Sequence, residues 1–169
     1  IFASLQQLPM PTIAMIEGLA VGSGLLMATA CDFRISTPDA RFGIPVAKTL
    51  GNCLSPSNLS WIATHLGVPM VKKMLLTAEL IKAPELLESG FLYQTADAVE
   101  IEAVTNALSQ KLAALAPITQ KASKLALARL LQSNLPDCTD LMRETYNSQD
   151  FREGVNAFLD GRPPKWVGK

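Results

Sequence analysis

The pattern of apolar and polar residues changes along the chain, from short apolar runs to longer stretches with helical spacing. The short runs predict strands over residues 12–17, 32–37, 41–44 and 91–95. The glycines of 18–24 predict a turn, and the small apolar residues of 25–31 predict a packed helix. Helical spacing with prolines and caps at the ends predicts helices over 1–8, 55–66, 69–77, 84–89, 97–115, 117–132, 137–147 and 149–160. This order predicts one α/β layer with a helical C-terminal extension.

Several helix ends carry recognisable capping residues. Ser55 followed by Pro56 is a hydroxyl N-cap followed by proline at the first helical position. Gly67 stands just past the expected end of that helix, as a C-terminal glycine does. Asp97 is expected to cap the long amphipathic helix that follows it.

The apolar stretch 13–31 has nearly the length of a membrane span. However, Glu17 and a Gly-Ser-Gly turn fall inside it, and a backbone break in lipid leaves polar groups unpaired. A buried strand, turn and helix therefore explains these residues better than a transmembrane helix.

Composition indicates a globular domain. Of the 169 residues, 49% are hydrophobic and 18% are charged, and the formal net charge is zero. This balance gives no support to a nucleic-acid partner or to a polybasic membrane surface. The chain also has no signal-peptide pattern at its start.

Cysteine and histidine are too sparse for a disulfide framework or a zinc site. Cys31, Cys53 and Cys138 are widely spaced, and His65 is the single histidine. We therefore expect no metal, a structural or surface role for His65, and a reducing compartment. The cytoplasm fits, and mitochondria and peroxisomes remain open.

The glycine turn is a candidate anion site. In GLAVGSGLLMA the turn comes directly before a helix, whose first N–H groups have no partner within the helix. Such N–H groups can hold negative charge, including the enolate oxygen that develops from a thioester carbonyl. The same glycines could also serve only to pack a strand closely against a helix.

Four stretches carry a resemblance to a known family. The runs PTIAMIEGLAVGSGLLMATACDFRIST, ARFGIP, LTAELIKAPELLESGFLYQT and SQDFREGVNAFLDGRPPKWVG stand in the order found in the crotonase (enoyl-CoA hydratase/isomerase) superfamily. The chain resembles that family over almost its whole length. The resemblance implies an α/β fold of the ClpP/crotonase type, a spiral core of ββα units.

The resemblance also divides the chain. Residues 1–96 correspond to the C-terminal part of the spiral core, and 97–169 to the helical region through which the family forms trimers and often hexamers. We expect the family's N-terminal segment to lie upstream of Ile1. The implied ligand is an acyl-CoA thioester, so coenzyme A enters as part of the substrate and no separate cofactor is expected.

The family's oxyanion hole uses two backbone N–H groups, of which the second corresponds to Ser23. The first is expected from the upstream segment. Gly22 and Gly24 flank Ser23 in the implied substrate site. Arg162, Lys165 and Trp166 match the family's basic and aromatic tail, which can reach a CoA phosphate or adenine; a solvated tail is the other interpretation.

The carboxylates of a hydratase are missing from their expected positions. Hydration of an enoyl thioester needs a base for water and an acid for carbon. The family's two glutamates correspond to Leu26 and Val46, and the acid of some isomerases and dehalogenases falls near Cys53. Leucine and valine transfer no protons and can only line the substrate pocket.

Two nearby polar residues are catalytic candidates. Cys53 precedes the Ser55-capped helix, whose N-terminus could favour a thiolate nucleophile or base; a small buried thiol is the simpler interpretation. Asn52 could orient a carbonyl or only fix a turn.

Three functions follow from these residues. The first is a divergent acyl-CoA isomerase or lyase that keeps the oxyanion hole. The second is a non-catalytic acyl-CoA-binding or assembly subunit. The third is thiol chemistry through Cys53, such as thioester hydrolysis.

Overall fold

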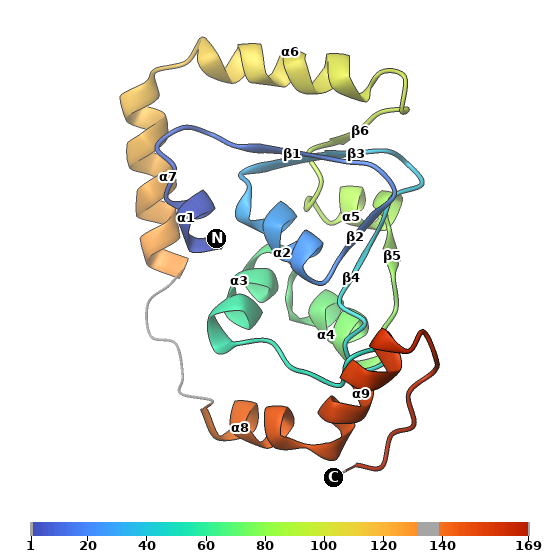
Figure 1. Cartoon of the computed structure of the whole chain (residues 1–169). Helices are drawn as coiled ribbons and strands as arrows, with labels where there is room; N and C mark the ends of the chain where they lie inside the picture. Colours follow the sequence, from blue (N-terminus) through green and yellow to red (C-terminus); the bar gives the residue numbers. More distant parts are fainter. Residues whose placement is uncertain (1, 132–138, 169) are drawn as a thin grey trace.

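Two strands followed by a helix form the unit on which the fold is built. In the computed structural model, which describes residues 2–131 and 139–168, the first unit is β1 (Ile13–Ile16), β2 (Leu19–Val21) and α2 (Ser23–Ala30). The second begins with β3 (Phe33–Ser36) and β4 (Arg41–Gly43) and continues into α3 (Pro56–Leu66). β3 pairs in parallel with β1, and β4 pairs in parallel with β2. The units therefore stack as successive turns of a spiral (Figure 1), which confirms the predicted fold class.

Short elements complete the two sheets. The order is β1-β3-β6 in one sheet and β2-β4-β5 in the other, with β5 antiparallel to β4. The remaining elements in the described residues are α1 (Phe2–Gln6), α4 (Val68–Leu76), β5 (Ile81–Lys82), α5 (Ala83–Glu88), β6 (Gln94–Thr95), α6 (Ile101–Ala113), α7 (Pro117–Leu131), α8 (Thr139–Asn147) and α9 (Gln149–Leu159).

Gly18 allows the chain to leave one sheet and enter the other. Its φ of 73° lies in the left-handed region that favours glycine. Its carbonyl accepts a hydrogen bond from the Arg41 N–H at 2.8 Å, so the turn is fixed to the start of β4. The first and second units are thereby held in register at the point where the chain changes sheets.

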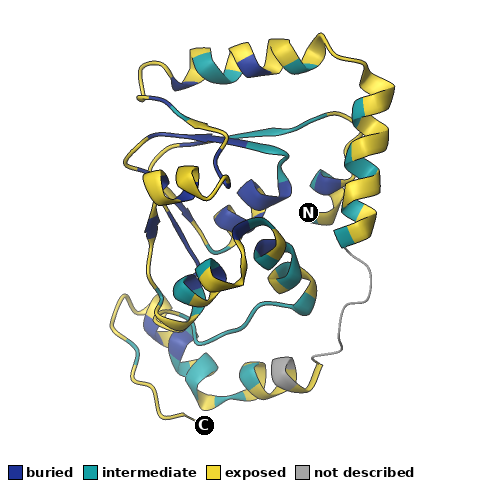
Figure 2. Cartoon of the chain, turned by 180° about the vertical axis from the view of Figure 1, so that it is seen from behind, coloured by how far each residue is buried: buried dark blue, intermediate teal, exposed yellow. Residues whose placement is uncertain are grey.

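Side chains from the two faces of the β1-β3-β6 sheet enter different cores. Ile16 joins the larger cluster, which includes Phe42, Leu25 and Ile62 from the other sheet and the inner helices. Ile35 joins a smaller cluster with residues of α6. Figure 2 shows the buried residues concentrated in the strands and inner helices. α6 therefore covers one face of this sheet, and the spiral lies on the other.

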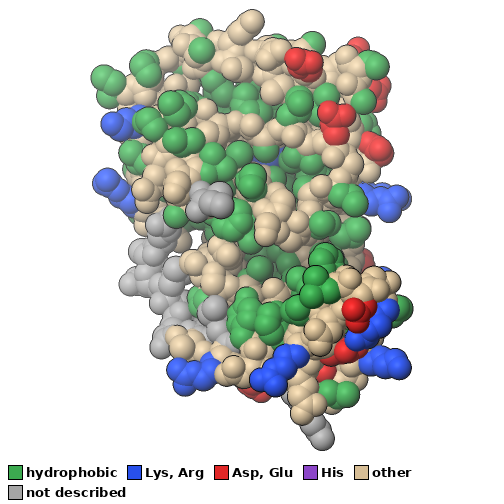
Figure 3. Space-filling model, viewed as in Figure 1, with side chains coloured by type: hydrophobic (Ala, Val, Ile, Leu, Met, Phe, Trp, Pro, Cys, Tyr) green, Lys and Arg blue, Asp and Glu red, His purple; other side chains and the backbone are tan. Residues whose placement is uncertain are grey.

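The outer helices keep exposed apolar side chains. α7 has no buried residue among those described, and Leu127 and Leu130 are 60% and 71% exposed. At the end of α9, Phe158 and Leu159 are also exposed. Hydrophobic side chains gather over α7 and beside α9 in Figure 3. Association into trimers or hexamers stays a prediction, as does the domain boundary at residue 97.

Most predicted elements are confirmed, with differences at short strands and helix starts. The Asn58 N–H donates to the Ser55 hydroxyl at 3.3 Å, which confirms that cap. The prediction that Asp97 caps the next helix is wrong. The helix begins at Ile101, and the backbone carbonyl of Asp97 accepts hydrogen bonds from the Glu100 and Ile101 N–H groups in the turn before it. The strand expected over 91–95 is reduced to β6, and β2 and β5 were not predicted. The first residues of the helix predicted over 137–147, residue 132 and Cys138 lie outside the described residues.

The described residues contain neither a membrane-spanning helix nor a cluster of metal ligands. None of the helices in 2–131 and 139–168 is both long and apolar enough to cross a bilayer. In the same ranges, no three His, Cys, Asp or Glu side chains are grouped so that they could hold a metal ion.

Candidate functional site

The glycine turn positions the start of α2. Gly22 has φ 53° and ψ −118°, a conformation that glycine adopts readily and other residues avoid. Its N–H donates to the Gly43 carbonyl at 2.9 Å, which fixes the turn beside the end of β4. Its carbonyl accepts from the Leu26 N–H at 3.1 Å and so begins the ladder of α2. The turn is therefore held at both ends.

Ser23 is the first helical residue of α2, and its N–H faces no partner within the helix. The hydrogen bonds of the described residues include none donated by this N–H. Ser23 is exposed, and a Cβ built on Gly22 or Gly24 meets nothing within 4 Å. A serine is well tolerated at a position with helical φ, so the serine in place of the family's middle glycine leaves the turn intact. The geometry is that of an open donor at a helix N-terminus.

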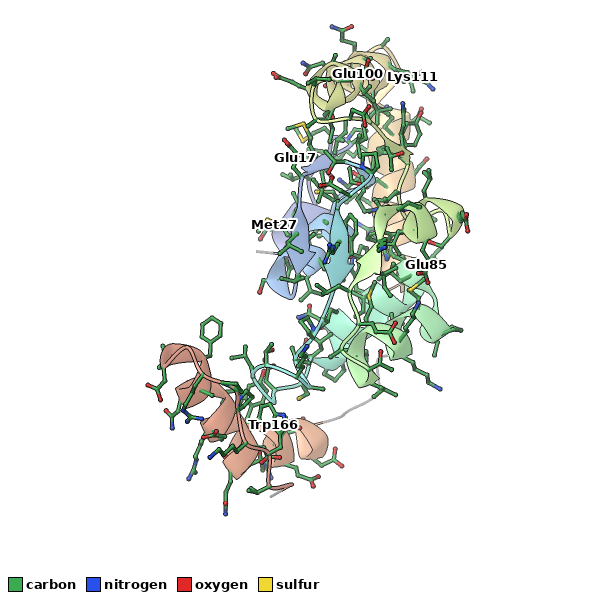
Figure 4. The ribbon with its side chains drawn as sticks, turned by 90° about the vertical axis from the view of Figure 1, so that its right-hand side faces the viewer. Glu17, Met27, Glu85, Glu100, Lys111 and Trp166 are labelled. Atoms are coloured by element: carbon green, nitrogen blue, oxygen red, sulfur yellow. The ribbon has the colours of Figure 1, made fainter. Side chains whose placement is uncertain are left out.

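Exposed apolar side chains lie on the strands and the helix on either side of this turn. Met15, Leu19, Val21 and Met27 all lie on β1, β2 or α2 and are between 36% and 64% exposed. Figure 4 shows Met27 on the outer side of α2, pointing away from the core, with Glu17 on the same side of the molecule. A donor amid apolar surface suits a ligand that joins a polar carbonyl to a hydrocarbon group.

The two positions predicted to have lost their acids contribute to the main core. Leu26 is only 5% exposed and lies among the buried side chains of the larger cluster. Val46 is half-buried and packs against the same cluster. A glutamate at Leu26 would place a carboxylate in this apolar core, which strongly disfavours its charged form. The structure therefore uses Leu26 for packing.

Asn52 and Cys53 lie in the segment between β4 and α3, and both are half-buried. The Asn52 Oδ1 atom is buried and has no hydrogen-bond partner among the described residues. The carbonyl of Cys53 accepts a bond from the Tyr146 hydroxyl at 3.2 Å. Asn52 thus has a free acceptor, and Cys53 helps to connect this segment to α8. Their catalytic roles stay predictions.

The tail residues Arg162, Lys165 and Trp166 fold back onto α9. The Arg162 guanidinium holds Glu153 through two bonds of 2.6 and 3.0 Å, and the Lys165 N–H donates to the same carboxylate at 2.9 Å. The bond from Arg162 lowers the pKa of Glu153 to about 2. In this arrangement the Arg162 side chain forms an ion pair within the chain, while the Lys165 side chain remains exposed.

α9 and the tail together clamp the loop that carries Val46. A Cβ on Gly154 would stand 2.9 Å from the Leu50 Cα, and closer still to the Leu50 carbonyl. A Cβ on Gly51 would meet the Trp166 ring at 3.0 Å. Asp150 accepts backbone bonds from Val167 and Gly168 at 2.6 and 2.9 Å and fixes the tail. The loop is thus positioned by contacts from the far end of the chain.

Arg34 is a structural residue, at the end of α2 opposite to Ser23, that the sequence pattern did not reveal. It is buried, and its guanidinium donates to the carbonyls of Phe91 and Cys31, both at 2.6 Å. It also lies over the Phe91 ring at 4.5 Å and reaches the Ala28 carbonyl at 3.3 Å. Burial lowers the pKa of Arg34 from its ordinary value. The signal available for it was a charged residue within an otherwise buried strand. In the structure, Arg34 caps the C-terminal end of α2.

Comparisons with known proteins agree with this architecture. The family model for enoyl-CoA hydratase/isomerase matches residues 1–169. Short-chain-enoyl-CoA hydratase of Clostridium acetobutylicum is 29% identical, over 96% of this chain and 63% of its own length. Probable enoyl-CoA hydratase echA6 of Mycobacterium leprae is 32% identical, over 95% of this chain and 64% of its own length.

A solved structure shows the same fold. Methylmalonyl-CoA decarboxylase in complex with 2-nitronate-propionyl-CoA matches with a TM-score of 0.93 and 26% identity, covering 99% of this chain and 66% of that one. The chain thus spans somewhat less than two thirds of the length of the two curated relatives. The family match, the spiral of ββα units and the glycine turn agree, and the chain belongs to the enoyl-CoA hydratase/isomerase family of the crotonase superfamily.

Proposed function

We propose that the complete protein binds an acyl-CoA thioester and stabilises its enolate oxygen with the Ser23 N–H. The observation that carries this proposal is the open, unpartnered N–H at the start of α2, held in place by Gly22. An N–H donor already fixed at the place where negative charge develops lowers the barrier without reorganisation. The resemblance to the family implies a second N–H donor beside it.

We further propose that the reaction is not the family's two-glutamate hydration. Leu26 and Val46 present only carbon atoms, so neither can activate water or protonate carbon. An isomerase reaction, in which one group can both remove and return the proton, or a lyase reaction fits these residues better. Any acid that it requires must come from another position, such as the segment around Cys53.

Decarboxylation is the candidate within this class that needs the fewest proton transfers from side chains. Breaking the bond to the carboxylate releases carbon dioxide and leaves its electron pair in the enolate, so no base has to remove a proton. One later protonation at carbon completes the reaction. The structural likeness to methylmalonyl-CoA decarboxylase supports this candidate, and so does the absence of a carboxylate at Leu26 and Val46.

The second candidate function is non-catalytic binding of acyl-CoA or assembly. The packing of Leu26 in the core favours it, because a buried aliphatic side chain takes no part in proton transfer. The third, thiol chemistry at Cys53, predicts that a Cys53→Ala variant loses turnover. Full turnover in that variant would exclude it.

The experiment that separates these functions is mass spectrometry of acyl-CoA thioesters incubated with the complete protein. The panel contains 2-enoyl, 3-enoyl, malonyl-type and saturated thioesters, with chromatography to separate isomers of equal mass. We expect a change in the malonyl-type or 3-enoyl members and none in the 2-enoyl members. Hydration of a 2-enoyl thioester would contradict the proposal, and binding without any product would favour the non-catalytic function.

A further inference from the structure

A cavity of about 510 Å³ lies at the end of α2 opposite to the glycine turn. It is open on one side and is lined by the last residue of α2, by α1 and α3, and by α6 and α7 with their connection. At about 1.5 Å per residue, the eight residues of α2 separate it from Ser23 by roughly 12 Å. The cavity therefore lies away from the Ser23 N–H.

Most of the cavity wall is hydrocarbon. Leu112, Leu115, Leu127 and Leu131 line one side, and Phe33 and Pro11 contribute from the sheet side. Its volume lies within the range of roughly 300–1,000 Å³ that small-molecule sites occupy. Such a wall favours an aromatic or aliphatic body over a polar one.

The two charged groups of the cavity neutralise each other. The Lys124 side chain is only 10% exposed, and its Nζ lies 2.7 Å from Asp32 Oδ2 and 3.0 Å from the Met10 carbonyl. Asp32 also accepts from the Thr12 N–H and hydroxyl at 2.7 and 2.8 Å. Because both charges are satisfied within the protein, a charged ligand would lose its own hydration and gain no free counterion.

Among the polar side chains that line the cavity, which include Gln6 and Gln120, His65 offers a ring nitrogen as an acceptor. His65 Nδ1 lies 2.8 Å from the Trp61 carbonyl, which can only accept, so the proton sits on Nδ1 and Nε2 carries the lone pair. Burial lowers the pKa of His65, which keeps the ring neutral near pH 7. The Trp61 indole N–H already donates to the Thr29 carbonyl at 3.1 Å. Burial likewise raises the pKa of the Cys31 thiol and keeps it uncharged.

We propose that this cavity binds a small, uncharged, mainly apolar molecule whose single hydroxyl or N–H group donates a hydrogen bond to His65 Nε2. The leucine wall holds the hydrocarbon body, and the neutral imidazole orients the polar end. The ligand also contacts Cys31, which directly follows α2. A molecule bound here would therefore touch the helix whose opposite end presents Ser23.

The test uses three matched probes with the complete protein. 2-Naphthol carries one donor, 2-methoxynaphthalene lacks it, and 2-naphthoate is charged. Binding is followed by calorimetric titration. We expect 2-naphthol to bind about tenfold more tightly than the methyl ether, since one hydrogen bond is worth roughly 1.4 kcal/mol, and 2-naphthoate to bind most weakly. Equal affinity of naphthol and ether, or no binding of naphthol, would overturn the proposal.

Variants of α7 and α3 locate the bound probe. Ala128→Trp fills the cavity and should abolish binding, whereas Ala126→Trp on the exposed face of α7 should leave it unchanged. His65→Phe should remove the preference for naphthol over the ether while keeping the ring contact with Trp61. Unchanged binding in Ala128→Trp, or displacement of naphthol by an acyl-CoA, would place the probe elsewhere and refute this site. Thermal unfolding of each variant checks that it is folded.

Discussion

The tight contact between α9 and the Val46 loop predicts opposite effects for two chemically identical substitutions. In Gly154→Ala, the new Cβ would lie 2.9 Å from the Leu50 Cα and still closer to the Leu50 carbonyl. These are backbone atoms of a loop held by internal hydrogen bonds, including Gly51 N–H to Val46 carbonyl at 2.8 Å. The helix and the loop therefore have to separate.

The magnitude follows from two opposing contributions. Alanine in a helix interior stabilises by about 1 kcal/mol relative to glycine. Overpacking a tight contact costs roughly 1–3 kcal/mol, and the backbone on both sides places this case at the upper end. We expect Gly154→Ala to lower the free energy of unfolding by about 2 kcal/mol. Gly24→Ala, in helical backbone with nothing within 4 Å of the new Cβ, should raise it by up to about 1 kcal/mol.

Urea unfolding of the wild type and both variants measures this difference, with equal m-values as the check that the unfolded states are comparable. Hydrogen exchange should also increase in residues 45–53 of Gly154→Ala alone. If Gly154→Ala were as stable as the wild type, or if both alanines shifted stability in the same direction, the proposed clamp between α9 and the loop would be refuted.

Three further predictions test other parts of the structure. Arg34→Met should lower the free energy of unfolding by about 3 kcal/mol, because buried carbonyls lose their donor; a loss below about 1 kcal/mol in chemical denaturation would contradict the capping role. Burial lowers the pKa of His65 in the folded protein. As the pH falls, the unfolded chain therefore takes up a proton on His65 near pH 6.5, before the folded chain does. Stability should then decline below that pH in the wild type but less steeply in His65→Phe, as thermal unfolding at several pH values can show. Asp150→Ala should release the tail and shift the emission of Trp166 toward that of an exposed indole, an effect absent from the control Asp39→Ala at an exposed turn.

Local features of the fold were accessible from the sequence, whereas contacts made over long distances were not. The strand–turn–helix of the first unit and the Ser55 cap depend on neighbouring residues and were predicted. β2 and β5 escaped prediction because they are very short and exist only through pairing with β4, which the local pattern does not encode. Aspartate is a residue type that often caps helices, yet Asp97 lies in a turn, where its backbone carbonyl accepts hydrogen bonds.

The same distinction holds for the candidate site. Resemblance to the family pointed to Ser23 and to the apolar residues at Leu26 and Val46. It could not show that Glu153 would pair with Arg162, because those side chains meet only when the tail folds back. The cavity beside His65 likewise gathers residues from α2, α3 and α7, which are far apart in the sequence.

The central claim is that the Ser23 N–H stabilises the enolate, and proline at this position tests it most directly. Ser23 is the first helical residue of α2, where proline is well accepted, and Gly22 before it has no Cβ to clash with the ring. Ser23→Pro therefore removes the N–H with little expected change in fold, while Ser23→Ala retains it.

The measurement is the turnover, by the complete protein, of the thioester identified in the acyl-CoA panel. We predict a loss of about 100-fold or more in Ser23→Pro, the scale expected for one oxyanion-hole donor, and near wild-type turnover in Ser23→Ala. Equal turnover in a folded Ser23→Pro variant and the wild type would contradict the claim.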